Sequence, residues 1–291
     1  MTIGTYDGVH LGHRMVISQV RELAEQRRMP SVLVTFDRHP ARVIRPESAP
    51  KLLCELPHKL ELLEGTGLDF TAVVRFDAER AHEPAEEFVR QSLVRCLGAK
   101  IVVVGRDFRF GHARRGDVAL LESMGKELGF EVRGLALAEA GGEVVSSTRI
   151  RGLIAQGEVS QAGRLLGREH EVRGEVVRGD ARGRELGFPT ANVALADDLA
   201  LPCNGIYAGW VGLDGQTFAA AISLGTRPTF GDGSDRRLEA YILDFDDNLY
   251  GQELKVRFVQ RLRPELRFSD RAALVGQMRS DVAQTRALLG R

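Results

Sequence analysis

Short apolar runs alternate with helical patterns along the first half of the chain. Ser31–Phe36, Ala72–Phe76 and Ile101–Val104 are rich in β-branched residues and have the length of strands. Between them, His13–Arg28 and Pro84–Leu97 repeat apolar residues at helical spacing. This alternation predicts an α/β fold, in which a parallel sheet carries helices on both faces. Ligands of such sheets bind beyond the carboxyl ends of the strands, so we expect functional residues in the loops there.

From about residue 170 onward the pattern changes to alternating strands and glycine-rich turns. An Asp-Gly pair at 214–215 lies between the strand-like runs Ala208–Leu213 and Thr217–Ile222, as in a hairpin with a two-residue turn. The segment Leu254–Phe258 also alternates between apolar and charged residues. An antiparallel barrel or sandwich is the simplest fold for this all-β half.

The C-terminal tail is predicted to be a helix. Ser269 is its expected N-cap, and four apolar residues recur on one face of the segment that follows, namely Leu274, Met278, Val282 and Leu289. We expect the boundary between two domains near Leu166–Gly167, after a helical stretch and before the first β segment. This division gives an N-terminal domain of residues 1–166 and a C-terminal domain of residues 167–291.

The composition fits two domains that each have an apolar core. Of the 291 residues, 43% are hydrophobic and 27% are charged, which is ordinary for a globular protein. No apolar run reaches the ~18 residues of a membrane span, and the N-terminus has no signal-peptide pattern. The cysteines, Cys54, Cys96 and Cys203, form neither a disulfide framework nor a zinc pattern. We therefore expect a cytoplasmic protein with no membrane partner.

Charge is balanced, with 40 basic and 40 acidic residues, and each half of the chain is close to neutral. A nucleic-acid binder usually concentrates Lys and Arg on one face or in one segment. We therefore expect no nucleic-acid partner, and we expect a few of the scattered arginines to bind phosphate. The sequence does not predict the oligomeric state.

A glycine-rich segment, Gly4–His13, runs from the end of a strand into a helix. Its glycines allow the backbone to approach a phosphate, and the start of the helix offers N–H groups. His10 and His13 can donate hydrogen bonds to phosphate oxygens and to the charge that develops during phosphoryl or nucleotidyl transfer. Taken alone, the two histidines are also compatible with an ordinary surface or with half of a metal site.

Two more segments lie where a nucleotide would bind in an α/β fold. Gly105–Gly111 directly follows a predicted strand, at the carboxyl edge of the sheet, although it also fits an ordinary turn with two core aromatic residues. In Ser146–Arg151, hydroxyls at the start of a helix and an Arg one turn inside can clamp a polyphosphate. A routine N-cap is the other interpretation of this segment.

The C-terminal half contains one long candidate segment, Gly179–Asn192, in which three glycines surround arginines. This composition suits a flexible lid over phosphates, and it suits a plain glycine-rich hairpin loop equally well. Thr190 and Asn192 supply uncharged oxygen ligands on one face of an extended segment, which fits Mg²⁺ better than zinc. Glu239 lies in the alternating run Leu238–Phe245, where it can take a proton from an alcohol or remain a solvated glutamate.

Taken together, these strings resemble one family. GTYDGVHLGH, VTFDRHP, GRDFRFG and SSTRIR are similar to the nucleotidyltransferase motifs of bacterial bifunctional riboflavin kinase/FAD synthetases. GRELGFPTAN, GIYAG and GTRPTF are similar to their riboflavin kinase signatures, in the family's order. The resemblance covers essentially the whole chain. It implies a Rossmann-like nucleotidyltransferase domain followed by a six-stranded Greek-key barrel with a terminal helix.

The resemblance also implies the chemistry. ATP would phosphorylate riboflavin to FMN, and a second ATP would adenylylate FMN to FAD with release of pyrophosphate, with Mg²⁺ bridging phosphate oxygens. By this likeness Glu239 is the base for the riboflavin 5′-hydroxyl, and His10 and His13 steady the α-phosphate. The other expected site residues are Ser147, Thr148 and Arg149 on the leaving phosphates, Thr190 and Asn192 on Mg²⁺–ATP, Gly4, Asp7, Gly8, Gly12, Gly179 and Arg184 around ATP or phosphate, and Asp107, Phe108, Gly205 and Tyr207 in the flavin or nucleotide pocket.

The chain departs from the family pattern at two places that bear on function. It begins at Met1, close to Ile3, whereas relatives carry an upstream segment that completes the first strand. We therefore expect the first strand and the adenylyltransferase site to be compromised. Arg38 replaces the proline that usually precedes the pair His39-Pro40. This change is expected to loosen the loop without removing a catalytic group.

Two alternative functions follow. The first is a kinase whose N-terminal half is impaired as an adenylyltransferase. The second is a flavin- or nucleotide-binding regulator without turnover, which the sequence disfavours because a pure binder needs no catalytic base such as Glu239.

Overall fold

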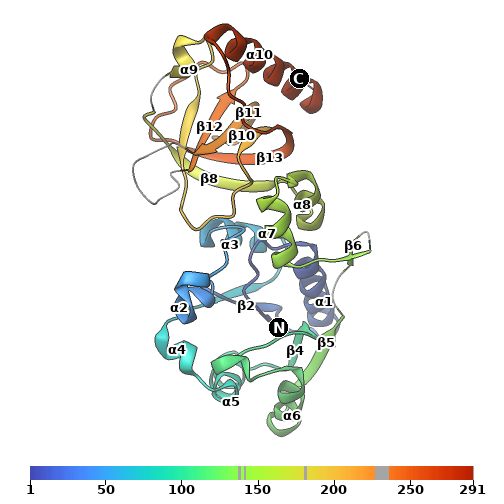
Figure 1. The fold of residues 1–291 in the computed structure, drawn as a ribbon. Coiled ribbons are helices and arrows are strands. Elements are labelled where there is room, and N and C mark those ends of the chain that lie inside the picture. The colour runs from blue at the N-terminus through green and yellow to red at the C-terminus, as the bar shows by residue number, and fades with distance from the viewer. Residues whose placement is uncertain (137–138, 141, 180–181, 227–235, 291) are drawn as a thin grey trace. The chain divides into compact units, whose positions relative to one another are not determined.

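The computed structural model describes residues 1–136, 139–140, 142–179, 182–226 and 236–290, and the side chains of Ala140, Arg182 and Arg184 lie outside this description. The chain divides into two compact units, Met1–Ser147 and Thr148–Arg291 (Figure 1). Each unit is described by itself below.

The first unit is built on parallel strands. β2 (Val32–Phe36) pairs with β1 (Thr2–Ile3) on one side and with β3 (Phe70–Val74) on the other, and β4 (Ile101–Gly105) pairs with β5 (Glu131–Leu135). The two pieces meet where the Val103 N–H donates to the carbonyl O of Met1, at 2.9 Å. This bond sets β4 beside β1 and gives the strand order β3-β2-β1-β4-β5. The order reverses direction between β1 and β4, which is where nucleotides bind in doubly wound sheets.

Helices connect these strands. The longer ones are α1 (Leu11–Arg27), α3 (Leu56–Glu64) and α6 (Val118–Leu128), and the shorter elements are α2 (Ala41–Ile44), η1 (Pro46–Ser48), α4 (Ala78–His82), α5 (Ala85–Phe88) and η3 (His112–Arg114). α5 continues directly as a π-helix, η2 (Val89–Cys96), so the helix predicted at Pro84–Leu97 changes its hydrogen-bond pattern midway. A short hairpin, β6 (Glu139–Ala140) and β7 (Glu143–Val144), follows β5.

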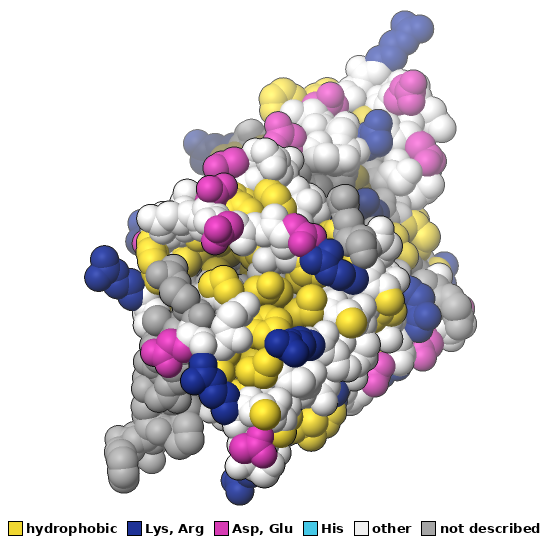
Figure 2. All heavy atoms as spheres, turned by 90° about the horizontal axis from the view of Figure 1, so that it is seen from above, with side chains coloured by type: hydrophobic (Ala, Val, Ile, Leu, Met, Phe, Trp, Pro, Cys, Tyr) yellow, Lys and Arg dark blue, Asp and Glu magenta, His cyan; other side chains and the backbone are white. Residues whose placement is uncertain are grey.

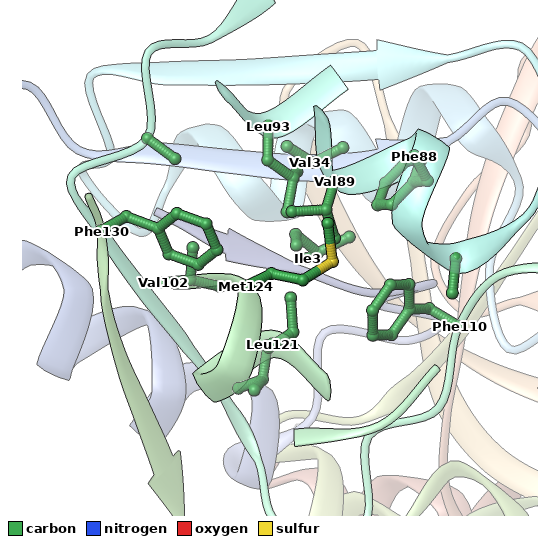
Figure 3. Close-up of a cluster of buried hydrophobic side chains, with 13 residues drawn as sticks. Ile3, Val34, Phe88, Val89, Leu93, Val102, Phe110, Leu121, Met124 and Phe130 are labelled. Carbon is green, nitrogen blue, oxygen red and sulfur yellow. The ribbon is translucent and has the colours of Figure 1, made fainter. Parts of the chain in front are cut away.

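Apolar side chains cover both faces of this sheet. On one face, side chains from the strands, such as Ile3 and Val34, meet Leu93 of η2 and Leu121 and Met124 of α6 (Figure 3). On the other face, α1 and α3 contribute buried side chains that pack on β2 and β4, namely Ile17, Val20, Leu23 and Leu63 against Leu33, Ile101 and Val103. The predicted parallel sheet with helices on both faces is confirmed.

The second unit contains a closed antiparallel barrel. Its strands are β8 (His170–Val177), β9 (Ala191–Ala194), β10 (Gly205–Leu213), β11 (Gln216–Thr226), β12 (Arg236–Ile242) and β13 (Glu253–Arg263), and their order around the barrel is β10-β11-β12-β9-β8-β13. The predicted hairpin turn is confirmed, because Leu213 pairs with Gln216 and the two residues between them have φ of 46° and 80°. Such left-handed backbone is the reason for an Asp-Gly turn. The structure thus resolves the choice between barrel and sandwich in favour of the six-stranded barrel.

Helices flank the barrel in sequence. α7 (Ser147–Ala155) and α8 (Val159–Leu166) precede it, α9 (Arg182–Glu185) lies between β8 and β9, and α10 (Arg271–Leu289) follows it. The N-cap of α10 is Asp270, whose carboxylate accepts the Ala273 N–H at 2.8 Å, so the predicted cap at Ser269 is wrong by one residue. Asp281 of α10 accepts two hydrogen bonds from the Arg263 guanidinium of β13, at 2.9 and 2.7 Å. This nearly buried ion pair ties the terminal helix to the barrel.

The boundary between the units falls at Ser147 in the structure, whereas the sequence favours Leu166–Gly167. The helices α7 and α8 occupy the interval, and α8 packs against β8 and β13. The assignment of residues 148–166 to the N-terminal domain stays a prediction.

The surface carries both signs of charge. Figure 2 shows Lys and Arg side chains interspersed with Asp and Glu over the face seen from above, around hydrophobic side chains gathered near its middle. Among the described residues, no helix combines the length and the apolar character that a bilayer crossing requires.

Candidate active sites

The glycine-rich turn between β1 and α1 holds its backbone in a rarely populated conformation. Tyr6, Gly8 and Val9 have φ of 48°, 79° and 38°. A positive φ costs energy in a β-branched residue such as Val9, and strain of this kind clusters at functional sites. Two hydrogen bonds hold the turn closed, one between the Tyr6 hydroxyl and Thr2 Oγ1 at 2.6 Å and one from the Val9 N–H to the Tyr6 carbonyl at 3.1 Å.

His10 and His13 lie together at the start of α1. His10 is the N-cap residue, and its Nδ1 accepts the backbone N–H of His13 at 3.3 Å. The two rings stack with their centroids 3.6 Å apart and their planes 14° from parallel. Because Nδ1 of His10 is an acceptor, this ring can donate a hydrogen bond only through Nε2. The geometry therefore supplies an imidazole donor at a helix N-terminus, which is a favourable place for a phosphate.

The Ser-rich segment meets the same turn. Ser147 Oγ donates to the carbonyl O of Asp7 at 3.1 Å. A Cβ on Gly12 would lie 3.2 Å from the His10 ring and 3.3 Å from the Val145 carbonyl, so only a residue without a side chain fits here at no cost. Ser147 is thereby brought to the turn, and Thr148 and Arg149 follow it as exposed residues in the first turn of α7.

The third predicted segment leaves β4, the neighbour of β1. A Cβ on Gly105 would lie 2.9 Å from Oδ1 of Asp107, so the carboxylate folds back over the end of its own strand. Phe108 stacks on Phe110 with ring centroids 5.4 Å apart, and Phe110 packs on Phe88 at 6.0 Å. Phe110 is a core residue, while Phe108 is half-buried at the edge of that core.

Two side chains of this site make contacts that the sequence does not indicate. The buried carboxylate of Asp7 accepts the backbone N–H groups of Leu53 and Cys54 at 3.0 and 3.3 Å, and its expected role in binding ATP or phosphate stays a prediction. Lys59 is missed by the sequence reasoning, although its ammonium is buried beside the turn. The one sequence signal for Lys59 is a cation on the face of a helix that also carries apolar Leu63.

In the barrel, Thr190, Asn192 and Glu239 come together. Glu239 of β12 lies directly opposite Asn192 of β9, and Thr190 Oγ1 donates to Oε2 of Glu239 at 3.1 Å. Leu238 and Ala240 fill the barrel interior, so the residue between them points to the outer face. The site therefore lies on the outside of the barrel wall.

The segment before β9 lies over this group. A Cβ on Gly179 would overlap the side-chain amide of Asn192, and a Cβ on Gly183 would overlap the carbonyl O of Phe188. Phe188 packs edge-on against Tyr241, a second outward residue of β12, with ring centroids 5.3 Å apart. The glycines are thus required for close packing against the oxygen ligands. Arg184 lies in α9, and its side chain falls outside the described residues.

Gly205 and Tyr207 do not join this group. They lie on β10, which pairs with β11 and β13 and stands opposite β9 in the barrel order. Tyr207 is fully buried, its hydroxyl donates to the carbonyl O of Cys203 at 2.5 Å, and burial raises its pKa well above the usual value. A structural role explains this geometry, and a role of the two residues in a ligand pocket stays a prediction. Residues 227–230 of the GTRPTF string lie outside the described residues.

The donors near Glu239 suit a hard cation. A hydroxyl, a side-chain amide and a carboxylate converge there, and Mg²⁺ prefers oxygen ligands of these kinds. Within the described part of the chain there is no group of three or more His, Cys, Asp and Glu residues with metal-binding geometry. Thr190 and Asn192 are the residues that would hold a magnesium ion here.

Comparison with known proteins gives a consistent result. A family model described as FAD synthetase matches residues 1–149, and one described as riboflavin kinase matches residues 166–289. Bifunctional riboflavin kinase/FMN adenylyltransferases of Escherichia coli strain K12 and Pseudomonas fluorescens are 37% and 38% identical to the chain, covering 100% and 99% of it and 92% of each relative. A crystal structure titled as a macrolide-efflux protein from Streptococcus pneumoniae superposes with a TM-score of 0.89 at 32% identity, covering 98% of this chain and 93% of the other. The chain therefore belongs to the family of bifunctional riboflavin kinase/FMN adenylyltransferases.

Proposed function

We propose that the chain makes FAD from riboflavin in two ATP-dependent steps, phosphorylation to FMN and then adenylylation with release of pyrophosphate. The observation that carries this proposal is that residues of the two motif sets meet separately, Ser147 with Asp7 in the first unit and Thr190 with Glu239 in the second. A single-site enzyme would need only one of them.

In the kinase step, Glu239 takes the proton of the riboflavin 5′-hydroxyl as that oxygen attacks the γ-phosphorus of ATP, and the bond from the γ-phosphorus to the bridging oxygen breaks to release ADP. Thr190 and Asn192 hold Mg²⁺, which neutralises phosphate charge when it is bound. The donor set described above and the close packing of Gly179 against Asn192 support this assignment. Gly179 and Arg184 belong to the segment that covers the phosphates in this proposal.

In the adenylyl step, His10 and His13 donate to the α-phosphate while pyrophosphate leaves, and no covalent intermediate is needed. Ser147, Thr148 and Arg149 hold the departing phosphates at the start of α7. Gly4, Gly8 and Gly12 allow the nucleotide to approach the backbone, and Asp107 and Phe108 line the nucleotide pocket at the end of β4. The adjacency of Ser147 to the turn supports this arrangement.

We assign both steps to the cytoplasm. The three widely spaced cysteines, Cys54, Cys96 and Cys203, suit a reducing compartment. We also propose 1–166 and 167–291 as the domains that carry adenylyl transfer and phosphorylation.

Chromatography of the products from riboflavin, ATP and Mg²⁺ tests the proposal against its alternatives. Accumulation of FAD supports the bifunctional enzyme. FMN without FAD would favour a kinase with an impaired N-terminal half, and unchanged riboflavin would favour a binding protein without turnover.

A further inference from the structure

A lysine that the two proposed reactions do not use is buried beside the adenylyl site. Lys59 lies on α3 and is 8% exposed. Its ammonium donates to the carbonyl O of Thr5 at 3.3 Å, to Thr35 Oγ1 at 3.2 Å and to the carbonyl O of Phe36 at 2.9 Å. Removing a charged group from water is costly unless it is fully hydrogen-bonded, and these acceptors match the three donors of an ammonium.

The acceptors belong to two different strand ends. Thr5 is in the glycine-rich turn after β1, and Phe36 is the last residue of β2. Thr35 Oγ1 also donates to the carbonyl O of Thr5 at 3.1 Å, so a second bond joins the same two strand ends. The Lys59 ammonium therefore cross-links the carboxyl edges of β1 and β2, where the ligand of a doubly wound sheet binds.

The segment that leads into α3 is also hydrogen-bonded to the turn, at Asp7 and Gly8. The Asp7 carboxylate accepts the N–H groups of Leu53 and Cys54, and the Gly8 N–H donates to Cys54 Sγ at 3.3 Å. Residues 53–59 thus hold the backbone on both sides of Tyr6. His10 follows directly after this part of the turn, as the N-cap of α1.

The surroundings of Lys59 act on its charge in two opposite ways. Burial lowers the pKa of the ammonium, and the nearby Cys54, Asp7 and Asp37 act in the opposite direction. An apolar side chain in place of Lys59 would remove this cost but would leave the carbonyls of Thr5 and Phe36 without their donor. A buried cation contributes little to the stability of the fold. Its presence here therefore favours a role in fixing the conformation of the turn.

We propose that Lys59 is a positioning residue for adenylyl transfer. Its ammonium fixes the turn at Thr5 against the end of β2 and so sets where His10 and His13 stand relative to the α-phosphate. This inference rests on the proposed adenylyltransferase function, and Lys59 itself touches no substrate.

Steady-state kinetics of FMN adenylylation test the proposal with the full chain. Lys59→Met should lower kcat at least tenfold while KM for FMN and for ATP changes less than threefold, because misplacement of catalytic groups slows the reaction at bound substrate. Lys59→Arg, which keeps a cation with several donors, should recover at least a third of the wild-type kcat. Phosphorylation of riboflavin by the same variants should match the wild type.

Leu93→Ala is the matched control for lost stability. Leu93 is fully buried in the same unit, in a core cluster on the sheet face that η2 and α6 cover, and that cluster contains no residue of the turn Gly4–His13. Leu93→Ala should lower Tm but keep the wild-type kcat for adenylylation when all variants are assayed below their unfolding temperatures. Should Lys59→Met fail to fold, the comparison of Lys59→Arg with Lys59→Gln takes its place. Gln has no charge and only the two N–H donors of its amide, so Lys59→Gln should be the slower.

Three results would overturn the proposal. They are a Lys59→Met kcat within threefold of the wild type, an equal loss in Leu93→Ala, and an Arg variant as slow as the Met variant. A wild-type chain that makes no FAD from FMN would instead contradict the proposed function, so the two failures are distinguishable.

Discussion

The hydroxyl of Thr190 donates a 3.1 Å hydrogen bond to Oε2 of Glu239, a residue 49 positions further along the chain. The bond joins the residue just before β9 to the middle of the neighbouring strand β12. It fixes the orientation of the carboxylate on the outer wall of the barrel, beside an amide that can also hold a cation. A base held in one direction favours proton transfer from one hydroxyl of a bound substrate.

Replacing Glu239 by Gln should abolish the kinase reaction and spare the adenylyl reaction. Gln keeps the size and the hydrogen bond to Thr190 but cannot accept a proton, so FMN formation should fall by about 100-fold or more. Conversion of supplied FMN to FAD should remain as in the wild type, measured by chromatography. Glu253→Gln, at the exposed start of β13, is the control and should leave both rates unchanged. Loss of both reactions in Glu239→Gln would argue against separate sites.

Gly179→Ala should impair phosphorylation through sterics alone. Its Cβ would overlap the side-chain amide of Asn192, so either that side chain or the covering segment must move. We expect at least a tenfold loss of kinase kcat/KM for ATP, with a higher Mg²⁺ requirement. Gly276→Ala on α10 meets no atom within 4 Å and should keep full activity, with stability raised by up to about 1 kcal/mol. Equal kinetics for both variants would show that the close approach at Gly179 is unimportant.

His13→Ala should stop FAD formation and leave FMN formation intact. The substitution removes the ring that stacks on His10 and one donor to the α-phosphate, which we expect to lower the adenylylation rate by about 100-fold or more. His82 and His112 form another stacked pair in the same unit, with centroids 5.3 Å apart, and both are bonded to backbone carbonyls. His112→Ala is therefore the matched control. A similar loss in both variants would assign the effect to stability.

The element types of the first unit could be predicted because buried apolar residues recur along the sequence with the period of a helix or fill short runs of strand length. The helix expected at His13–Arg28 is α1, and three strands fall within two residues of their expected positions. β3 is shifted toward the N-terminus because it begins at exposed Phe70, where no alternation marks the edge of the sheet. The barrel could not be told from a sandwich, since alternation reports one buried face but not the pairing of β10 with β13 that closes it.

The candidate sites were predictable as strings but not as contacts. The motifs identify Thr190, Asn192 and Glu239, and the register of β9 with β12 then joins them. The use of the Asp7 carboxylate could not be foreseen, because its partners Leu53 and Cys54 are more than 40 positions away. Lys59 was missed for the same reason, as its acceptors are known only once the two strand ends are aligned.

The ion pair that holds α10 should contribute strongly to the stability of the second unit. The side chains of Arg263 and Asp281 are only 15% and 5% exposed. Asp281→Ala leaves the guanidinium without its carboxylate, and we expect the free energy of unfolding to fall by about 3 kcal/mol. Urea denaturation followed through kinase activity measures the change. The exposed pair of Asp244 and Arg286 supplies the control, since Arg286→Ala should have almost no effect. Equal midpoints for the two variants would contradict the account.

The most direct test of two independent ATP-dependent sites is complementation between purified variants. Glu239→Gln and His13→Ala are each incubated with riboflavin, ATP and Mg²⁺, separately and as an equimolar mixture, and FAD is measured by chromatography. Neither variant alone should make FAD, and the mixture should make it, because FMN released by the His13 variant is adenylylated by the Glu239 variant. FAD from either variant alone, or none from the mixture while wild-type enzyme produces it, would contradict the account.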